Sequence, residues 1–203
     1  ERFGRLVLDR PAPAAEQFKP KQQGIWRDAD GRYARASADS GKWTWHGQPP
    51  GGWVVSHDPL HFQLKPTDFG HVGIFPEQAE NWDWIRAKVC PVGRPVKVLN
   101  LFAYTGGSTL AAAAAGAEVT HIDSAKNVVS WARANAKASG LADAPIRWIT
   151  EDAARFVQRE SRRCHRYDAI ILDPPSYGHG PKGETWKLAV DLTALLAGCA
   201  ELL

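Results

Sequence analysis

The sequence predicts an α/β fold in which a parallel, Rossmann-like sheet follows a small N-terminal antiparallel β module. From Val96 onward, short apolar runs alternate with helix-compatible segments, which is the pattern of a parallel sheet covered on both faces. One of these runs leads into Gly106-Gly107 and then into a row of alanines, as expected for a strand, a tight turn and a helix. Before residue 67, alternating segments are separated by turn residues, which indicates β-hairpins.

These patterns divide the chain of 203 residues into three parts. Residues 1–66 are predicted to form the β module. Residues 67–95 are predicted to form a linker and a helix that covers a ligand. Residues 96–203 are predicted to form the ligand-binding domain around the sheet.

Four tryptophans lie among the predicted hairpins of the N-terminal part. Turn signals stand at Asp30-Gly31 and at residues 49–52, between segments rich in strand-forming residues. Large aromatic side chains fill a small core efficiently, so we expect these four to form most of it: Trp26, Trp43, Trp45 and Trp53. The alternative is that the rings are platforms on which nucleic-acid bases stack.

A helix is predicted to begin at Pro76, because proline suits the first helical position. One face of this helix is apolar at helical spacing, through Trp82, Ile85 and Val89. The preceding loop contains Gly70 and Gly73 and could fold over a ligand at the sheet edge. Such a fold would bring three side chains near the ligand: His71, Phe75 and Gln78. The alternative is a packed connector.

Residues 96–123 have the pattern of half a nucleoside-binding crossover. A strand over 96–102 leads to Gly106-Gly107, where missing Cβ atoms let the backbone approach a ligand. Ser108 or Thr109 is expected to cap the alanine helix, and Gly116 to end it. The next strand, 118–122, leads into Asp123, whose carboxylate can accept both hydroxyl groups of a ribose.

The glycine spacing argues against a dinucleotide ligand. Dinucleotide-binding sites carry Gly-x-Gly-x-x-Gly, whereas the close glycines here are the adjacent pair Gly106-Gly107. A ligand with an adenosine but no pyrophosphate fits this pattern, and S-adenosylmethionine (SAM) is the common one. The alternative is a βαβ unit whose glycines only make a turn and whose Asp123 only caps a neighbouring group.

Further helices and strands continue the alternation. Helices are predicted over 127–139, over 153–163 and over 184–203, and strands over 146–149 and 167–172. Because the strands of a parallel sheet share one direction, their carboxyl ends meet at one edge. We therefore expect the segments that follow the strands to form one site.

Acidic side chains follow two of these later strands. Asp152 and Ala153 follow strand 146–149, where a carboxylate can meet the exocyclic amine of an adenine. Strand 167–172 leads into Asp173-Pro174-Pro175-Ser176-Tyr177, whose prolines hold the loop extended. The carboxylate and backbone carbonyls can then accept protons from a nucleobase amine while Tyr177 stacks on the base. The alternative is a proline-rich turn with Asp173 as a cap.

Taken together, these motifs resemble the class I SAM-dependent methyltransferases. The stretches 98–109, 121–123 and 171–177 carry the resemblance in order and spacing. Asp173-Pro174-Pro175, residues 100–107 and residues 75–78 are further similar to the bacterial 23S rRNA methyltransferases related to the large-subunit methyltransferase I. The resemblance spans about residues 68–188.

The resemblance implies both a cofactor set and a catalytic set. Residues 103–107 would wrap the methionine part of SAM, Asp123 and Ser124 would meet the ribose, and residues 152–153 would face the adenine. The full cofactor set is Phe75, Gln78, Asn100, Phe102, Ala103, Tyr104, Thr105, Gly106, Gly107, Asp123, Ser124, Asp152, Ala153 and Asp173. The catalytic set, which would meet the target base, is Asp173, Pro174, Pro175 and Tyr177. No metal is expected, because the sulfonium already activates the methyl group.

The sequence departs from this family's pattern in two respects. Relatives that methylate carbon 5 of cytosine need a cysteine nucleophile after a later strand. None of the three cysteines fits, because Cys90 and Cys164 precede strands and Cys199 lies in the predicted terminal helix. The family's sheet has seven strands, and four are predicted here, so we expect the sheet to be truncated at the C-terminus of this sequence.

Composition is compatible with an anionic partner and a soluble protein. The formal net charge is +3 and the pI is about 8.8. No apolar run reaches the roughly 18 residues that cross a bilayer, so we expect no membrane association. The cysteines are odd in number and scattered, which favours a reducing cytoplasm over a disulfide framework or a zinc site.

We therefore expect a cytoplasmic enzyme that transfers a methyl group from SAM to a base of RNA, with rRNA as the substrate. Lys182 and Lys187 stand beside the Asp-Pro-Pro loop and can contact phosphates. A second basic cluster precedes strand 167–172, at the edge away from the site: Arg155, Arg159, Arg162, Arg163, His165 and Arg166. The alternatives are methylation of a protein or small molecule, and a module that binds SAM without transferring its methyl group.

Overall fold

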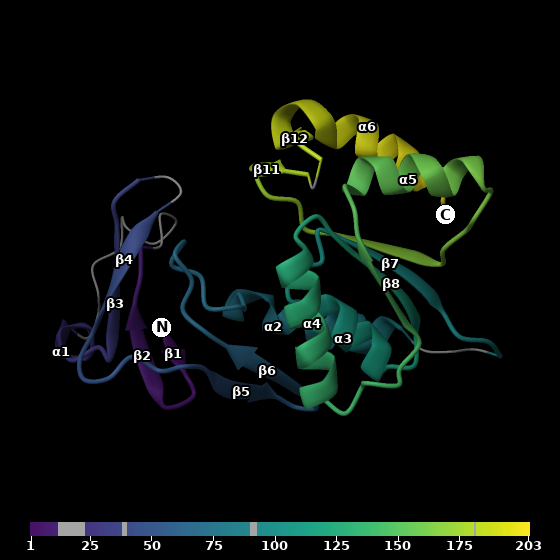
Figure 1. The fold of residues 1–203 in the computed structure, drawn as a ribbon. Helices are drawn as coiled ribbons and strands as arrows, with labels where there is room; N and C mark the ends of the chain where they lie inside the picture. The colour runs from purple at the N-terminus through teal and green to yellow at the C-terminus, as the bar shows by residue number, and fades with distance from the viewer. Residues whose placement is uncertain (12–22, 38–39, 90–92, 181) are drawn as a thin grey trace. The chain divides into compact units, whose positions relative to one another are not determined.

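The computed structural model describes residues 1–11, 23–37, 40–89, 93–180 and 182–203, and the chain divides into two compact units (Figure 1). The first unit is Glu1–Ile74 and the second is Phe75–Leu203. The segment 67–95, predicted as a linker with a covering helix, is thus divided. Its loop belongs to the first unit, and its helix belongs to the second.

Two small sheets form the described part of the first unit. One sheet has the order β1-β2-β3-β4 and the other is the hairpin β5-β6. The pairs are antiparallel except for β2 and β3, which run parallel with Leu8 opposite Gly31. A parallel pair needs a crossover, and the intervening chain includes a short helix. The elements are β1 (Arg2–Phe3), β2 (Leu6–Asp9), α1 (Gln23–Arg27), β3 (Gly31–Arg35), β4 (Gly41–Trp45), β5 (Trp53–His57) and β6 (Leu60–Leu64).

The prediction that four tryptophans form the core of this unit was wrong for three of them. Trp53 is buried, but Trp26, Trp43 and Trp45 are only partly buried. Trp43 and Trp45 stack on each other with ring centroids 5.2 Å apart on β4, an edge strand with one neighbour. Smaller side chains from several strands fill the core instead: Phe3, Leu8, Tyr33, Leu60, Phe62, Leu64 and Val72.

The second unit begins with the helix predicted from Pro76. A 3₁₀ turn, η2 (Pro76–Gln78), leads directly into α2 (Ala79–Lys88). The three side chains at helical spacing, Trp82, Ile85 and Val89, are all buried. The prediction of an amphipathic helix starting at Pro76 is confirmed.

A four-stranded parallel sheet forms the centre of the second unit, which confirms the predicted Rossmann-like class. Its order is β10-β7-β8-β9. Helices α2, α3 and α4 lie on one face, and α5 and α6 lie on the other (Figure 1). The elements are β7 (Lys97–Leu101), α3 (Gly107–Ala114), β8 (Glu118–Asp123), α4 (Lys126–Ala138), β9 (Ile146–Thr150), α5 (Ala153–Arg162), β10 (Ala169–Leu172) and α6 (Leu188–Ala200).

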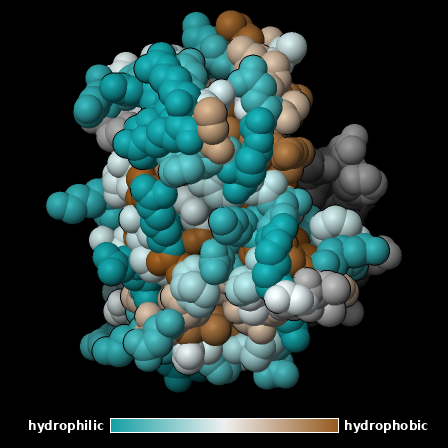
Figure 2. Space-filling model, turned by 90° about the vertical axis from the view of Figure 1, so that its right-hand side faces the viewer, coloured by the Kyte–Doolittle hydropathy of each residue, from teal (hydrophilic) through white to brown (hydrophobic). Residues whose placement is uncertain are grey.

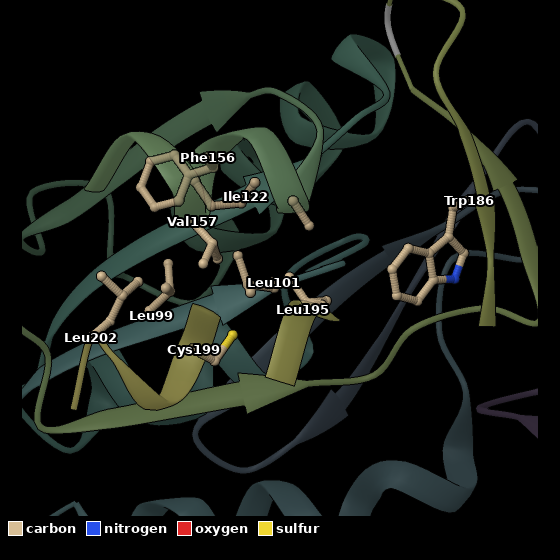
Figure 3. Packing of buried hydrophobic residues seen from close by; sticks show 10 residues of the cluster. Leu99, Leu101, Ile122, Phe156, Val157, Trp186, Leu195, Cys199 and Leu202 are labelled. Carbon is tan, nitrogen blue, oxygen red and sulfur yellow. The ribbon is translucent and has the colours of Figure 1, made fainter. Parts of the chain in front are cut away.

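The core beneath α5 and α6 holds these helices on the sheet. Figure 3 shows β7, β8 and both helices contributing to one cluster, with Trp186 at one end of it. Most of its members are aliphatic: Leu99, Leu101, Ile122, Val157, Leu195 and Leu202, together with Phe156 and Cys199. Burial of each such side chain contributes about 1.5–3 kcal/mol.

Two local predictions in this unit were wrong. The helix predicted over 184–203 begins at Leu188, because Thr185–Lys187 is a strand, β12, paired with β11 (Tyr177–His179). The Asp191 carboxylate accepts a hydrogen bond from the Lys187 amide at 2.7 Å and so marks the helix start. The other error is the expected Ser108 or Thr109 cap of α3, whose N-cap residue is Gly106.

Thr109 instead takes part in a buried polar chain that runs through β7 and β8. The Asn100 amide donates to the Thr109 hydroxyl at 2.9 Å, and that hydroxyl lies 2.9 Å from His121 Nδ1. His121 is fully buried, and its Nε2 atom has no hydrogen-bond partner in the described part of the chain. Burial lowers the pKa of His121 from 6.5 to about 3.

This buried imidazole should make the fold sensitive to mild acid. Below its ordinary pKa, the unfolded chain binds a proton at His121 that the folded chain does not bind, so stability is lost as the pH falls. We expect the free energy of unfolding to decrease by about 2 kcal/mol from about pH 7 to about pH 5 through this group alone. Urea unfolding of the wild type and of His121→Gln at both pH values measures the difference. Equal losses in the two proteins would contradict the assignment.

Candidate functional site

Four of the predicted segments leave the sheet at its carboxyl edge. Leu101 is paired with Ile122 on one side and with Leu172 on the other, and Asp123 is paired with Thr150. The segments that follow these strands therefore leave the same edge, and Asp123, Asp152 and Asp173 lie along it. The strand order reverses between β7 and β10, and ligands of open α/β sheets bind outside the carboxyl ends at such a point.

The loop after β7 has an unusual backbone. Phe102 and Tyr104 have φ angles of 54° and 50°, in the left-handed region that side chains disfavour, and Gly106 has a φ of 93°. The loop is held from two sides, because the Ala103 amide donates to the Ile122 carbonyl at 3.0 Å and the Asn135 side chain donates to the Thr105 carbonyl at 3.0 Å. Such strain is retained where surrounding structure enforces it, and it concentrates at ligand sites.

Asp123 ties this loop to the end of β8. Its two carboxylate oxygens accept the Tyr104 amide and the Ala125 amide, each at 2.9 Å. Burial raises the pKa of Asp123, and the backbone hydrogen bonds act in the opposite direction. A carboxylate has about four lone-pair directions, so the backbone bonds from Tyr104, Ala125 and Ser124 still leave acceptor capacity for a ligand hydroxyl.

The Asp152 side chain caps helix α5, a role that was not predicted from the sequence. Its carboxylate accepts the Arg155 amide at 3.0 Å and caps α5, so it satisfies one of the free amides of the helix start. Ala153 is buried beside it. The adenine role predicted for both residues stays a prediction.

The Asp-Pro-Pro loop projects from the end of β10 into solvent. Asp173 and Pro175 are exposed, Pro174 is partly buried, and Tyr177 is 54% exposed. Solvent exposure of an acidic and an aromatic side chain at the switch point leaves both available to a macromolecular substrate. The sequence alone predicted the loop but not what holds it in place.

Trp186 on β12 supplies this support. Its indole nitrogen donates to the Pro175 carbonyl at 2.7 Å, and its ring lies 4.9 Å from the ring of Phe102. Trp186 thereby connects the loop after β10 to the strained loop after β7. The only signal in the sequence was a tryptophan in an otherwise polar stretch.

The hairpin β11-β12 also reaches the end of β8. The Ser124 hydroxyl donates to the His179 carbonyl at 3.1 Å, and the His179 ring meets the Tyr177 ring edge-on with centroids 5.1 Å apart. Ser124 thus lies between the predicted ribose carboxylate and the predicted target loop. His179 also lies beside the candidate site, and it was not among the residues predicted from the sequence.

Four other residues that were predicted to lie near the ligand have different surroundings in the structure. The Phe75 ring lies 5.5 Å from the Tyr104 ring, and the Gln78 side-chain oxygen Oε1 accepts a hydrogen bond from the Asn81 side-chain amide. Asn100 is buried in the polar chain with Thr109, so its side chain faces the interior of the fold. His71 lies in the first unit.

The described cysteines offer no nucleophile at this edge. Cys164 follows α5, where β10 has not yet begun, and Cys199 is buried in α6. Burial raises the pKa of Cys199 to about 11, which disfavours its thiolate. Cys90 lies outside the described residues.

Within the described ranges, no group of three or more His, Cys, Asp or Glu side chains could hold a metal ion. No helix there is long and apolar enough to span a bilayer.

Gly107, the first residue of α3, is required by close packing. A Cβ atom at this position would lie 2.7 Å from three atoms of the buried Trp82 ring. We expect Gly107→Ala to destabilise the protein by about 1–3 kcal/mol, because a buried indole cannot move away cheaply. A denaturant titration measures this change.

The matched control is Gly51→Ala, where an added Cβ meets nothing within 4 Å. That variant should stay within about 1 kcal/mol of the wild type. Equal stability of the two variants would contradict the packing role assigned to Gly107.

Comparison with known proteins gives consistent matches. The sequence profile described as S-adenosylmethionine-dependent methyltransferase matches residues 13–203. The chain is 31% identical over 144 residues to the ribosomal RNA large subunit methyltransferase K/L of Shewanella frigidimarina, covering 70% of this chain and 19% of that protein. It is 31% identical over 134 residues to the ribosomal RNA large subunit methyltransferase I of Aeromonas salmonicida, covering 65% of this chain and 33% of that protein.

A solved structure matches almost the whole chain. The crystal structure of a SAM-dependent methyltransferase from Agrobacterium tumefaciens superposes with a TM-score of 0.91 at 43% identity, covering 98% of this chain and 64% of that one. The chain therefore spans about a fifth to a third of the two ribosomal RNA methyltransferases and about two thirds of this structural relative.

Proposed function

The chain belongs to the family of S-adenosylmethionine-dependent methyltransferases, and from this we propose that it methylates a base of RNA, with ribosomal RNA as the substrate. The observation that carries the proposal is the exposed Asp-Pro-Pro-Ser-Tyr loop beside a nucleoside-type site at the switch point. The two ribosomal RNA methyltransferases to which the chain is 31% identical support the choice of RNA.

The residues at the carboxyl edge suit the cofactor of this family. Gly106 has a left-handed backbone that lets the loop turn above the sheet edge, and Asp123 keeps acceptor capacity for ribose hydroxyl groups. We assign Ser124 to the same region, and residues 103–107 to the methionine part. Phe75 lies against Tyr104 and can cover the ligand. When bound, SAM supplies a methyl group that its sulfonium already activates.

The target base is assigned to the loop after β10. The Pro175 carbonyl is already engaged by Trp186, so the exposed Asp173 carboxylate is the acceptor that we assign to the base. It would orient an exocyclic amine and accept the proton that the amine loses. Tyr177 would stack on the base, and the two prolines limit the movement of the loop.

Positive charge beside this loop can hold the RNA backbone. Lys182 lies between the strands of the hairpin and Lys187 is paired with Tyr177 at its end, and both are exposed, so they can contact phosphates close to the target base. Ribosomes occupy the cytoplasm, and we propose that the protein acts there.

The test uses methyl-labelled SAM with ribosomal RNA and with total protein from cells that lack this protein. Label should enter RNA, and it should map to one nucleotide that is unmodified in those cells. Label in protein would overturn the choice of RNA. Bound SAM without transfer to any fraction would overturn the assignment of catalysis.

A further inference from the structure

A hollow of about 520 Å³ lies at the amino edge of the sheet, opposite the candidate site. Its walls come from the first residues of β7, β8 and β9, from the turn before β9, from α5 and from the segment after α5. The lining residues with polar or charged side chains are Lys97, Glu118, Thr120, Arg147, Glu160, His165, Arg166 and Tyr167.

The wall of this hollow carries three basic side chains and two carboxylates, those of Glu118 and Glu160. Lys97, Arg147 and Arg166 are exposed, and none forms an ion pair in the part of the chain that the structure describes. Two other arginines of this unit are paired, since Arg94 contacts Asp168 at 2.6 Å and Arg155 contacts Glu184 at 2.5 Å. Three cations that form no ion pair in the described part of the chain therefore share this hollow.

A buried carboxylate organises one wall. Glu160 is fully buried and accepts bonds from His165 Nδ1 at 2.9 Å and from the Tyr167 hydroxyl at 3.0 Å. Its other oxygen has no hydrogen-bond partner but lies 3.7 Å from Arg163 and 3.9 Å from Arg159. Glu160 therefore fixes the segment that carries Arg166 and also interacts with Arg147, so the three cations of the hollow outnumber its two carboxylates.

We propose that this hollow binds phosphate groups of an RNA strand and acts as a second anchor for the substrate. The proposal rests on the proposed function for the choice of RNA. Arginine and lysine in one concave site are the side chains that hold phosphate, through paired hydrogen bonds and charge. Figure 2 faces the edge at which the strands begin, and hydrophilic side chains gather over its upper part, where α5 lies.

The placement of the hollow gives the anchor a geometric role. Strands of five or six residues separate the two edges by about 17–20 Å. An RNA that contacts both edges must span this distance, so the anchor would favour RNA long enough to reach both edges over shorter fragments. It would restrict the approach of the target base without touching the reacting atoms.

The test is the salt dependence of RNA affinity, measured by fluorescence anisotropy with labelled ribosomal RNA fragments. The variant is Arg147→Ala with Arg166→Ala in the full chain. The loss of two phosphate contacts should lower the slope of log affinity against log salt by about 1.4 and weaken binding about 25-fold at about 0.1 M salt. Affinity for SAM should stay within about twofold, because the candidate cofactor site lies at the other edge.

The matched control is Arg133→Ala, which removes one exposed arginine from α4, outside the hollow. It should change affinity by less than half as much, on a logarithmic scale, as the double variant. A double variant with the affinity and slope of the control would overturn the anchor while leaving the proposed function intact. Wild-type protein without salt-dependent RNA binding would overturn the proposed function itself.

A competition experiment separates RNA from a small anion. Inorganic phosphate, added at constant ionic strength, should displace RNA from the wild type more effectively than from the double variant. Saturable phosphate binding together with unchanged RNA affinity in the double variant would assign the hollow to a small phosphorylated compound and overturn the RNA anchor.

Discussion

Replacing Asp173 with alanine should abolish methyl transfer while leaving the affinity for SAM within a few-fold of the wild type. The Asp173 carboxylate is exposed at the end of β10, next to two prolines that fix its backbone. Proton acceptance by a positioned carboxylate contributes about 10²- to 10⁴-fold to a reaction rate, so its removal should reduce turnover to background. Single-turnover transfer to ribosomal RNA and calorimetric titration with SAM measure the two quantities separately.

A conservative variant distinguishes orientation from proton acceptance. Asp173→Asn keeps an oxygen that can accept a hydrogen bond from the base but removes the charge. If the carboxylate only orients the base, this variant should retain a large part of the activity. If it also accepts the proton, the variant should resemble the alanine protein. Full turnover in Asp173→Ala would remove this residue from the mechanism.

The fold of the second unit was predictable because its signals are local. Alternating apolar and helical segments, the glycine pair and the acidic ends of the strands each occupy a few neighbouring residues. The observed strands 97–101, 118–123 and 146–150 agree with the predicted ones to within one or two residues. Burial of β7 and β8 on both faces explains why their sequence pattern is so clear, whereas β9 at the sheet edge is only partly buried.

Features that depend on contacts between distant residues were missed. The hairpin β11-β12 is held by Trp186, whose partners Phe102 and Pro175 are remote in sequence. A pattern of three residues such as Thr185–Lys187 is too short to reveal a strand, since strand preference reflects tertiary context. The partial exposure of Trp43 and Trp45 likewise follows from the position of β4 at a sheet edge.

The roles of individual acidic residues could be predicted only in part. Both a helix cap and an adenine contact place a carboxylate at the start of α5, so the capping bond of Asp152 was indistinguishable in sequence from a ligand contact. Asn100 shows the same limit, because a strand residue faces one side or the other according to register. Asp123 is different, since it accepts one backbone amide from the loop after β7 and one from the segment after β8, and its remaining acceptor capacity can serve a ligand.

Replacing Asp123 with alanine should weaken SAM binding by at least about 100-fold. Two hydrogen bonds from ribose hydroxyls to a charged acceptor contribute about 1.5–3 kcal/mol each, and their loss gives at least this change in Kd. The substitution also leaves the Tyr104 and Ala125 amides without their acceptor. The strained loop after β7 should therefore lose part of its support, which adds to the loss of affinity.

Calorimetric titration with SAM and thermal unfolding of the same samples separate binding from folding. The matched control is Asp143→Ala, which removes an exposed carboxylate from the turn before β9 and should leave the affinity unchanged. A folded Asp123→Ala protein that binds SAM as tightly as this control would show that the ribose is held elsewhere. In that case the acceptor capacity of Asp123 would serve only backbone amides, and its burial would be a feature of loop architecture alone.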